Sequence, residues 1–345
     1  MASTDEGNDV VLTSRIRLAR NLRDTPFPGW ASTEQRSAIF QRLTESANTL
    51  SSLKNGFSTE LSDLDQHEKQ LLVERHLISR ELAARSGGCG VSISKNQSLS
   101  ILFNEEDHLR LQYILPGLQL KRAWTTLNKI DSELESRLSY AYDNRLGYLT
   151  SCPTNLGTGM RASAMLHLPG LVLDGAMEQV FRAADQLKLT IRGLYGEGTA
   201  PTGNLFQLSN QSTLGEKEEL ILERLKRVVQ DIAKQEFNAR QRILKNDPTA
   251  IADKVCKAYG ILKYSMLMPS HEAFEHISIL RLGTTLGLLE QTVLPKLNEL
   301  TLNIQPAHLQ PSNTEQAFER DQIRASVIRR FMENVPEPSI NTIPN

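Results

Sequence analysis

Four short segments of the chain concentrate arginines, carboxylates and glycines. In the first, SRIRLARN at 14–21, Arg15 and Arg17 alternate. On an extended strand both guanidinium groups would therefore lie on one face. Two planar cationic groups side by side suit the oxygens of a polyphosphate. Read alone, the segment is more typical of a solvated basic edge strand.

The second segment, NEEDHLR at 104–110, places Glu105, Glu106 and Asp107 directly after an apolar stretch. Three adjacent acids at a strand end are not typical of a core. They indicate either a solvated turn or the surroundings of a cation. Because strand ends and the loops after them commonly carry catalytic residues, we keep the second interpretation open.

The third segment, SCPTNLGTGMRAS at 151–163, contains glycines that allow a ligand close to the backbone. We expect Arg161 to begin a helix, where an anion is favoured. Cys152 is reactive if such an environment lowers the pKa of its thiol. The alternative is an ordinary strand-to-helix connection with a buried free thiol. The fourth segment, RGLYGEG at 192–198, fits either a lid over a substrate or a long hairpin loop.

The sequence contains neither a GxxxxGK[ST] phosphate loop nor the HRD and DFG segments of protein kinases. Phosphate binding would therefore depend on arginine side chains. The candidates are Arg15, Arg17, Arg110, Arg161 and Arg192. Five arginines with nearby glutamates indicate phosphoryl transfer onto a cationic acceptor.

The hydrophobic pattern indicates which elements position these segments. Ser32 and Gln35 form a capping-box pair at the start of a predicted helix. Alternating apolar residues predict a hairpin, and two further strands flank the glycine-rich loop. The predicted helices are 32–50, 66–86, 108–140 and 161–186, and the predicted strands are 91–93, 99–103, 146–151, 187–194 and 204–210. Hairpins mixed with helices indicate an α+β fold with an antiparallel sheet flanked by helices.

After Gly215 only helical patterns follow, and residues 216–246 contain neither glycine nor proline. Further helices are predicted at 248–259, 270–300 and 312–334. We therefore expect a catalytic domain at 11–215, an all-helical C-terminal domain at 216–335 and a tail at 336–345.

Composition excludes several classes of protein. The chain of 345 residues has 39 basic and 40 acidic residues, which argues against broad nucleic-acid or anionic-membrane binding. Its three cysteines show no CxxC spacing, so neither a disulfide framework nor a zinc ribbon is indicated. The acidic N-terminus is not a secretory signal, and no apolar run is long enough for a membrane span. We expect a cytoplasmic protein.

The four segments, in this order, resemble the ATP:guanido phosphotransferase family, which includes creatine and arginine kinases. The resemblance spans residues 11 to about 330. It is strongest to bacterial members that phosphorylate arginine side chains of proteins, as PFP at 26–28, HLIS at 76–79 and GNLFQLSNQSTLG at 203–215 indicate. The small-molecule kinases carry a helical domain before the first arginine motif, whereas 13 residues precede Ser14 here.

The resemblance implies ATP as the phosphate donor, Mg²⁺ as its metal and roles for individual residues. Glu106 is the candidate base, Glu197 the carboxylate that orients the acceptor, and Cys152 the residue that tunes and positions it. The implied ATP-binding residues are Ser14, Arg15, Ile16, Arg17, Leu18, His76, Arg110, Arg161, Ala162, Ser163, Ala164, Met165, Arg192, Gly193, Leu194, Tyr195, Gly196 and Glu197. No residues are assigned to a metal. Without the resemblance His76 would be a surface or core histidine, and His108 is interpreted as structural.

A further match implies regulation. The RDxxRA motif of those bacterial members, which forms a phosphoarginine-binding allosteric pocket, corresponds to Arg320, Asp321, Gln322, Ile323, Arg324 and Ala325. By itself this segment is typical of a charged helix face. The resemblance also implies a homodimer, an activator protein, Clp-type protease machinery as partner, and a role in marking proteins for degradation or in stress. The alternatives are a kinase for free arginine and an inactive scaffold that binds phosphoarginine.

Overall fold

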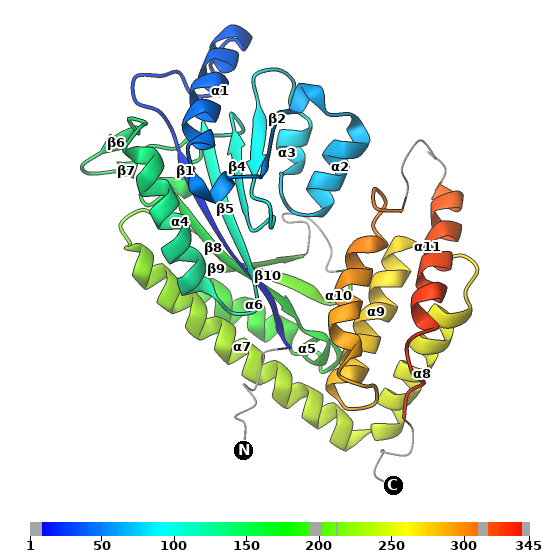
Figure 1. Cartoon of the computed structure of the whole chain (residues 1–345). Helices are drawn as coiled ribbons and strands as arrows, with labels where there is room; N and C mark the ends of the chain where they lie inside the picture. Colours follow the sequence, from blue (N-terminus) through cyan, green and yellow to red (C-terminus); the bar gives the residue numbers. More distant parts are fainter. Residues whose placement is uncertain (1–8, 194–201, 212, 310–316, 340–345) are drawn as a thin grey trace.

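The computed structural model describes residues 9–193, 202–211, 213–309 and 317–339 (Figure 1). These residues form an eight-stranded antiparallel sheet in the order β2-β3-β4-β5-β1-β8-β10-β9, and a group of helices beside it. The strands of this sheet are β1 (Val11–Arg20), β2 (Phe57–Glu60), β3 (Gly90–Ile93), β4 (Leu99–Phe103), β5 (Leu109–Pro116), β8 (Met160–His167), β9 (Leu189–Gly193) and β10 (Leu205–Asn210). The predicted antiparallel α+β fold is confirmed.

The α-helices fall into an N-terminal set around the sheet and a C-terminal set. The first set is α1 (Thr33–Asn48), α2 (Gln66–Glu74), α3 (Arg80–Ala83), α4 (Leu120–Glu135), α5 (Pro169–Leu173), α6 (Met177–Gln186) and α7 (Glu218–Asn246). The second is α8 (Pro248–Tyr264), α9 (Ser270–Thr285), α10 (Val293–Asn303) and α11 (Ala317–Met332). The capping box of α1 is as predicted, because Ser32 and Gln35 exchange hydrogen bonds of 3.2 and 2.8 Å.

The sheet buries one face under α4 and α7 (Figure 1). Ile16 and Leu18 of β1 lie in this core with Leu127 of α4. The sequence pattern grouped α7 with the later helices. In the structure its apolar stripe, including Leu225 and Val229, packs into the core of the sheet instead. The helices α8–α11 share a second core, which Leu205 of β10 joins.

Two of the predicted helices begin with residues that form a strand in the middle of the sheet. The helix prediction was wrong for the residues of these two strands. The stretch 108–140 consists of β5 followed by α4, and 161–186 consists of β8 followed by α5 and α6. In β8 the core-facing side chains Ala162 and Ala164 are small, so the alternation has little hydrophobic contrast. Pairing with β1 on one side and β10 on the other satisfies the backbone of β8 and fixes it as a strand.

Three smaller boundaries also differ from prediction. The helix expected at 66–86 divides into α2 and α3, because His76 adopts a φ of 58° that ends the first helix. The strand expected at 146–151 is limited to β7 (Gly147–Tyr148), which pairs with β6 (Tyr142–Asp143). The helix expected at 270–300 is α9 and α10, separated at Gly287 with a φ of 80°.

Candidate functional site

The face of the sheet opposite α4 and α7 carries the arginines. Along β1, Ile16 and Leu18 enter the core, so Arg15 and Arg17 share the opposite face, as predicted. The register places Arg17 opposite Arg161 of β8 and Ala19 opposite Arg110 of β5. A cavity of about 690 Å³ results, and all five candidate arginines line it: Arg15, Arg17, Arg110, Arg161 and Arg192. Arg161 lies on a strand, so the expected helix N-terminus is not part of the site.

The arginines of this cavity repel one another. Burial, and then the charges of Arg110 and Arg161, lower the pKa of Arg15 to about 10. The pKa of Arg17 is also well below its usual range, from burial and then from Arg15, Arg110 and Arg161. The buried Nε atoms of Arg15 and Arg17 have no hydrogen-bond partner among the described residues. Such a concentration of desolvated positive charge is suited to bind a polyanion.

The three acids after β4 have different surroundings. Glu105 is buried, accepts a hydrogen bond from Ser79 and pairs with Arg110 at 2.5 Å. Asp107 is also buried and accepts from the amide of Asn21 at 2.6 Å and from the backbone N–H of Ser151 at 2.7 Å. Only Glu106 remains accessible, with 43% of its side chain exposed and its carboxylate 3.2 Å from Arg110. The structure thus places Glu106 beside the arginines.

The environment of Glu106 favours a basic carboxylate. Partial burial raises its pKa, the neighbouring carboxylate of Asp107 raises it further, and Arg110 opposes both effects. A carboxylate whose pKa lies closer to neutrality is a stronger base than an ordinary surface glutamate. Glu105 and Asp107 hold the backbone on either side of it. The arrangement can thus offer a proton acceptor next to bound phosphates.

The loop at 151–155 forms another edge of the same cavity. The Ser151 hydroxyl donates to the carbonyl of Glu106 at 2.8 Å, which fixes the loop to the acidic turn. Cys152, Thr154 and Asn155 line the cavity, and the Cys152 thiol contacts the Thr154 hydroxyl at 3.0 Å. Cys152 is partly exposed rather than buried. The alternative of a buried free thiol is therefore wrong.

His76 lines the cavity from the other side. Burial and the charges of Arg15 and Arg80 lower its pKa to about 4, so its ring is neutral near pH 7. Its carbonyl accepts from the Gln112 side chain at 2.7 Å, which holds the turn after α2 against β5. His108, by contrast, accepts from the backbone N–H of Leu22 and contacts the carbonyl of Pro26, each at 3.0 Å. These contacts fit the structural role expected for His108.

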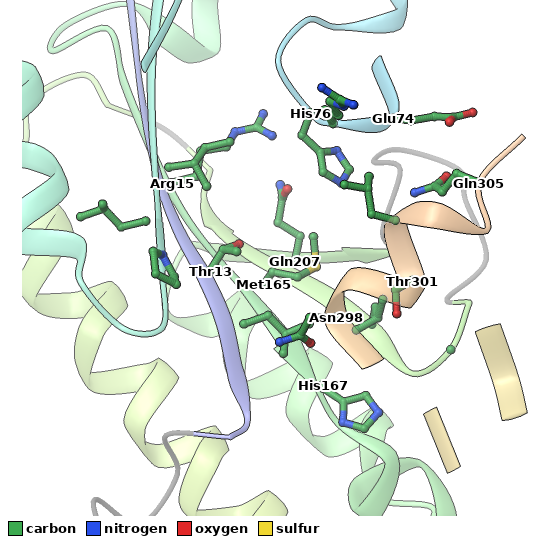
Figure 2. A pocket seen from close by; sticks show the side chains of 18 of the residues that line it. Thr13, Arg15, Glu74, His76, Met165, His167, Gln207, Asn298, Thr301 and Gln305 are labelled. Carbon is green, nitrogen blue, oxygen red and sulfur yellow. The ribbon is translucent and has the colours of Figure 1, made fainter. Parts of the chain in front are cut away.

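A second cavity, of about 700 Å³, adjoins the first (Figure 2). The two share Arg15, His76 and Gln207. Ser163 and Met165, two of the predicted ATP-binding residues, line the second cavity. So do residues of α9 and α10 that the sequence did not indicate, because no local pattern predicts which helix face closes over the sheet.

Other predicted site residues differ in exposure. Ser14, Ile16, Ala162 and Ala164 are buried, and the Ser14 hydroxyl donates to the Gly117 carbonyl at 2.7 Å. Leu18 borders the arginine cavity although it is buried. Gly193 ends β9. Leu194, Tyr195, Gly196 and Glu197 lie outside the described residues, so the orienting role of Glu197 remains a prediction.

The RDxxRA segment lies on α11. Arg324 is 2% exposed, and its guanidinium donates to the carbonyls of Ile304 at 2.9 Å and Met268 at 2.7 Å and to Asp321 at 2.5 Å. Its hydrogen bonds are thus made within the fold. Arg320 and Asp321 are partly exposed beside it, while Gln322 is exposed, Ile323 half-buried and Ala325 buried. Arg324 is placed to hold Asp321 rather than to contact a ligand directly.

Two other kinds of site have no counterpart in the described part of the chain. There, no group of three or more histidine, cysteine, aspartate or glutamate side chains is arranged to hold a metal ion. Every helix within the same ranges is too short or too polar to cross a lipid bilayer.

Comparison with known proteins agrees with this geometry. Residues 38–239, more than half of the chain, match the ATP:guanido phosphotransferase C-terminal catalytic domain, and residues 248–343 match the protein-arginine kinase McsB C-terminal domain. The protein-arginine kinase of Pelotomaculum thermopropionicum is 43% identical over 95% of this chain and 94% of that protein. That of Halalkalibacterium halodurans is 44% identical over 93% and 91%, respectively.

Solved structures show the same fold. The crystal structure of lombricine kinase aligns with a TM-score of 0.61 at 24% identity, over 71% of this chain and 70% of that one. The substrate-free duplicated taurocyamine kinase from Schistosoma mansoni also gives a TM-score of 0.61, at 24% identity, over 79% of this chain and 40% of its own length. At this identity the similarity concerns the fold alone.

Proposed function

Because this chain belongs to the ATP:guanido phosphotransferase family, we propose that it transfers the γ-phosphate of ATP to arginine side chains of proteins. One observation carries the proposal: Glu106 lies in the same cavity as a cluster of arginines whose positive charges outnumber the carboxylates around them. The two relatives at 43 and 44% identity, both named protein-arginine kinase, support a protein-bound acceptor. They also favour it over free arginine, the second candidate.

In the proposed reaction Glu106 removes a proton from the acceptor. A guanidinium has a pKa above about 12, so at neutral pH it is protonated and a poor nucleophile. Proton transfer to Glu106 frees a nitrogen lone pair, which attacks the γ-phosphorus while the bond to the ADP oxygen breaks. Glu197 is proposed to hold the planar acceptor, and Cys152 to contact it from the loop at 151–155. The arginines stabilise the negative charge that spreads over the transferring group.

ATP is proposed to place its phosphates among Arg15, Arg17, Arg110, Arg161 and Arg192, with His76 at the junction of the two cavities. Mg²⁺ is proposed to enter with the nucleotide. In kinases this ion binds largely through substrate phosphates and water. It would supply further neutralisation of the phosphate charge.

The test is direct detection of the product. Purified protein is incubated with ATP, Mg²⁺ and a basic protein, and mass spectrometry is performed under conditions that preserve the acid-labile N–P bond. Phosphate on arginine side chains is expected, with little turnover on free arginine. Rapid turnover on free arginine would favour the small-guanidine kinase, and incorporation on neither acceptor, with candidate activators present, would favour an inactive scaffold.

We further propose that the region around Arg320 and Asp321 binds phosphoarginine. A ligand of this kind has a dianionic phosphate, which suits Arg320, and N–H groups that can donate to Asp321. The buried bonds of Arg324 support a role in orienting Asp321. The reaction product would then bind a second site, which is the requirement for feedback.

The remaining proposals concern organisation and partners. A homodimer formed through the C-terminal helices is supported by the exposure of Tyr264 and Met266, at 70 and 71%, next to α11. We propose Asp247 as the boundary between the domains, since α7 packs with the sheet. Cytoplasmic location stays a proposal from the sequence. An activator protein and delivery of modified proteins to Clp-type proteases stay proposals from family resemblance.

A further inference from the structure

The residues directly before His76 bind a segment of the C-terminal domain. Glu74, the last residue of α2, is 2% exposed, and both of its carboxylate oxygens accept from the backbone N–H of Ala307, at 2.9 and 3.1 Å. One of these oxygens also contacts His308 Nδ1 at 2.9 Å. Figure 2 shows Glu74, His76 and Gln305 at the same edge of the second cavity. The segment that follows α10 is therefore bound to the end of α2.

The two partners of the His308 ring determine where its proton lies. Arg75 Nε donates to His308 Nε2 at 3.1 Å, and a guanidinium has hydrogen-bond donors only. His308 Nε2 is therefore the acceptor, so the ring proton lies on Nδ1 and is donated to the Glu74 carboxylate. The neutral ring, 7% exposed, thus joins two consecutive residues of the catalytic domain through both of its nitrogens. Glu74, Arg75, Ala307 and His308 together form an interdomain clamp.

His76 follows the clamp in a backbone conformation that needs support. Its φ of 58° lies in the left-handed region, which is disfavoured for residues other than glycine. Such conformations persist where the surrounding contacts fix them. The clamp holds the residues that precede His76, and Gln112 of β5 donates to the His76 carbonyl at 2.7 Å. The position of His76 at the junction of the two cavities is thus supported from both domains.

The C-terminal segment of the clamp is itself held in place. Ile304 is buried, and its carbonyl accepts from Arg324 Nε of α11 at 2.9 Å. The backbone N–H groups of His308 and Leu309 both donate to the carbonyl of Gln305, each at 3.1 Å, so the segment forms a compact turn. Gln305 is 5% exposed. A buried turn fastened to α11 is a rigid support for the residues that it binds, unlike a flexible linker.

We propose that the interdomain clamp positions His76, so that the C-terminal domain sets the nucleotide affinity of the catalytic domain. The inference rests on the proposed function, which places His76 beside the bound nucleotide. Glu74, Arg75 and His308 are then positioning residues, because their effect on the nucleotide passes through His76. A clamp that served only to pack the domains together would act differently. Its loss would lower the free energy of unfolding and leave the nucleotide affinity of the folded protein unchanged.

The test measures ADP binding by calorimetry on the full chain and on variants of the clamp. His308→Ala removes the bonds of the ring to Glu74 and Arg75, and we expect ADP affinity to fall roughly tenfold. His308→Asn keeps a side-chain N–H near the place of Nδ1 for Glu74 and should stay within about threefold of wild type. His271→Ala, at a side chain 66% exposed on α9, is the matched control and should leave ADP affinity unchanged.

A double-mutant cycle shows whether the clamp acts through His76. His76→Ala should weaken ADP binding by itself, and adding His308→Ala should cause little further loss. Independent losses that add, or unchanged ADP affinity in either single variant, would overturn the inference. If thermal unfolding shows that His308→Ala is not folded, Arg75→Met, at an exposed position, repeats the cycle with a smaller expected loss.

The same variants distinguish this inference from the proposed function. A coupled loss of ADP binding, in a protein whose wild type phosphorylates no arginine, would support the clamp and reject the proposed acceptor. Arginine phosphorylation by the wild type, with normal ADP binding by His308→Ala, would keep the proposed function and reject the clamp.

Discussion

At the scale of single residues, the surroundings of a side chain in the fold, rather than its chemical type, determine its role. Glu105, Glu106 and Asp107 are chemically alike, yet two are buried and bonded while Glu106 faces the arginines. The buried pair fixes the strand end and the loop at 151–155. This division leaves one carboxylate accessible to a substrate.

Replacing Glu106 by glutamine should remove the proton acceptor and keep the shape of the side chain. We expect the rate of arginine phosphorylation to fall at least about 100-fold, as for loss of a general base, with ADP affinity largely retained. Rates are measured by incorporation of labelled phosphate. Glu81→Gln changes an exposed carboxylate at the rim of the same cavity and should stay near wild type. Near-normal turnover by Glu106→Gln would exclude it as the base.

The arginine cluster should make the protein without nucleotide less stable than it would be with fewer charges. Arg15 has its pKa lowered by burial and by like charges, so its charged form is disfavoured in the folded state. Arg15→Met is expected to stabilise the nucleotide-free protein by roughly 1 kcal/mol and to weaken ADP binding. Thermal unfolding with and without ADP measures both effects. Unchanged ADP affinity would contradict the assignment of this arginine to phosphate.

At the scale of elements, α11 joins a candidate ligand site to the segment after α10. Arg324 binds the carbonyls of Ile304 and Met268 and thereby holds both neighbouring segments. Arg320, one turn away, is partly exposed. The two arginines of one motif are therefore expected to have separable roles, structural for Arg324 and ligand-binding for Arg320.

Substitution of each arginine should reveal this separation. Arg320→Ala, alone or with Asp321→Ala, is expected to abolish binding of free phosphoarginine, measured by calorimetry with the catalytic cavity blocked by a nucleotide analogue. Arg324→Ala should instead lower the free energy of unfolding by about 2–4 kcal/mol, because buried carbonyls lose their donor. Arg330→Ala, at an exposed position on α11, is the control. Equal phosphoarginine binding by wild type and Arg320→Ala would place the ligand elsewhere.

At the scale of the whole molecule, buried neutral histidines connect stability to pH. Burial lowers the pKa of both His76 and His108 to about 4, and it holds the pKa of His167 well below its usual range. Near pH 7 they are neutral in the folded and largely neutral in the unfolded chain. As the pH falls below about 6.5, the unfolded chain takes up protons that the folded chain excludes.

Stability should therefore be level above about pH 6.5 and fall toward pH 4, by up to about 1.4 kcal/mol per pH unit for each histidine. Urea unfolding between pH 7 and 4.5 measures this slope. His108→Gln should reduce the slope by about one proton. His271→Gln, at a side chain 66% exposed, should leave it unchanged. A slope independent of His108 would show that this histidine is not buried in its neutral form.

We also expect two copies of the chain to associate into a homodimer. The exposed Tyr264 is the last residue of α8, and the exposed Met266 lies in the connection between α8 and α9. Light scattering on the full chain at micromolar concentration should give a dimer, and Tyr264→Asp with Met266→Asp should weaken it. A wild-type monomer under these conditions would reject the proposed assembly.

The sequence by itself determined the motifs, the capping box of α1, the antiparallel α+β class and the hairpins. These features depend on the spacing of residues that are close in the sequence, as in a capping box or an alternation of apolar and polar residues. It also identified the five arginines and Glu106 as candidates. The family resemblance, rather than periodicity, supplied the roles of His76 and Cys152.

Only the tertiary structure decided which residues share a cavity. The strand identity of β5 and β8 depends on pairing with β1, a contact between distant segments, so the local pattern was mistaken for helix. The packing of α7 on the sheet also depends on partners that its own stripe does not specify. The closure of α9 and α10 over the second cavity, with Arg281 inside it, has the same origin. An apolar stripe shows that one face of a helix is buried, but the rest of the fold determines which element that face packs against.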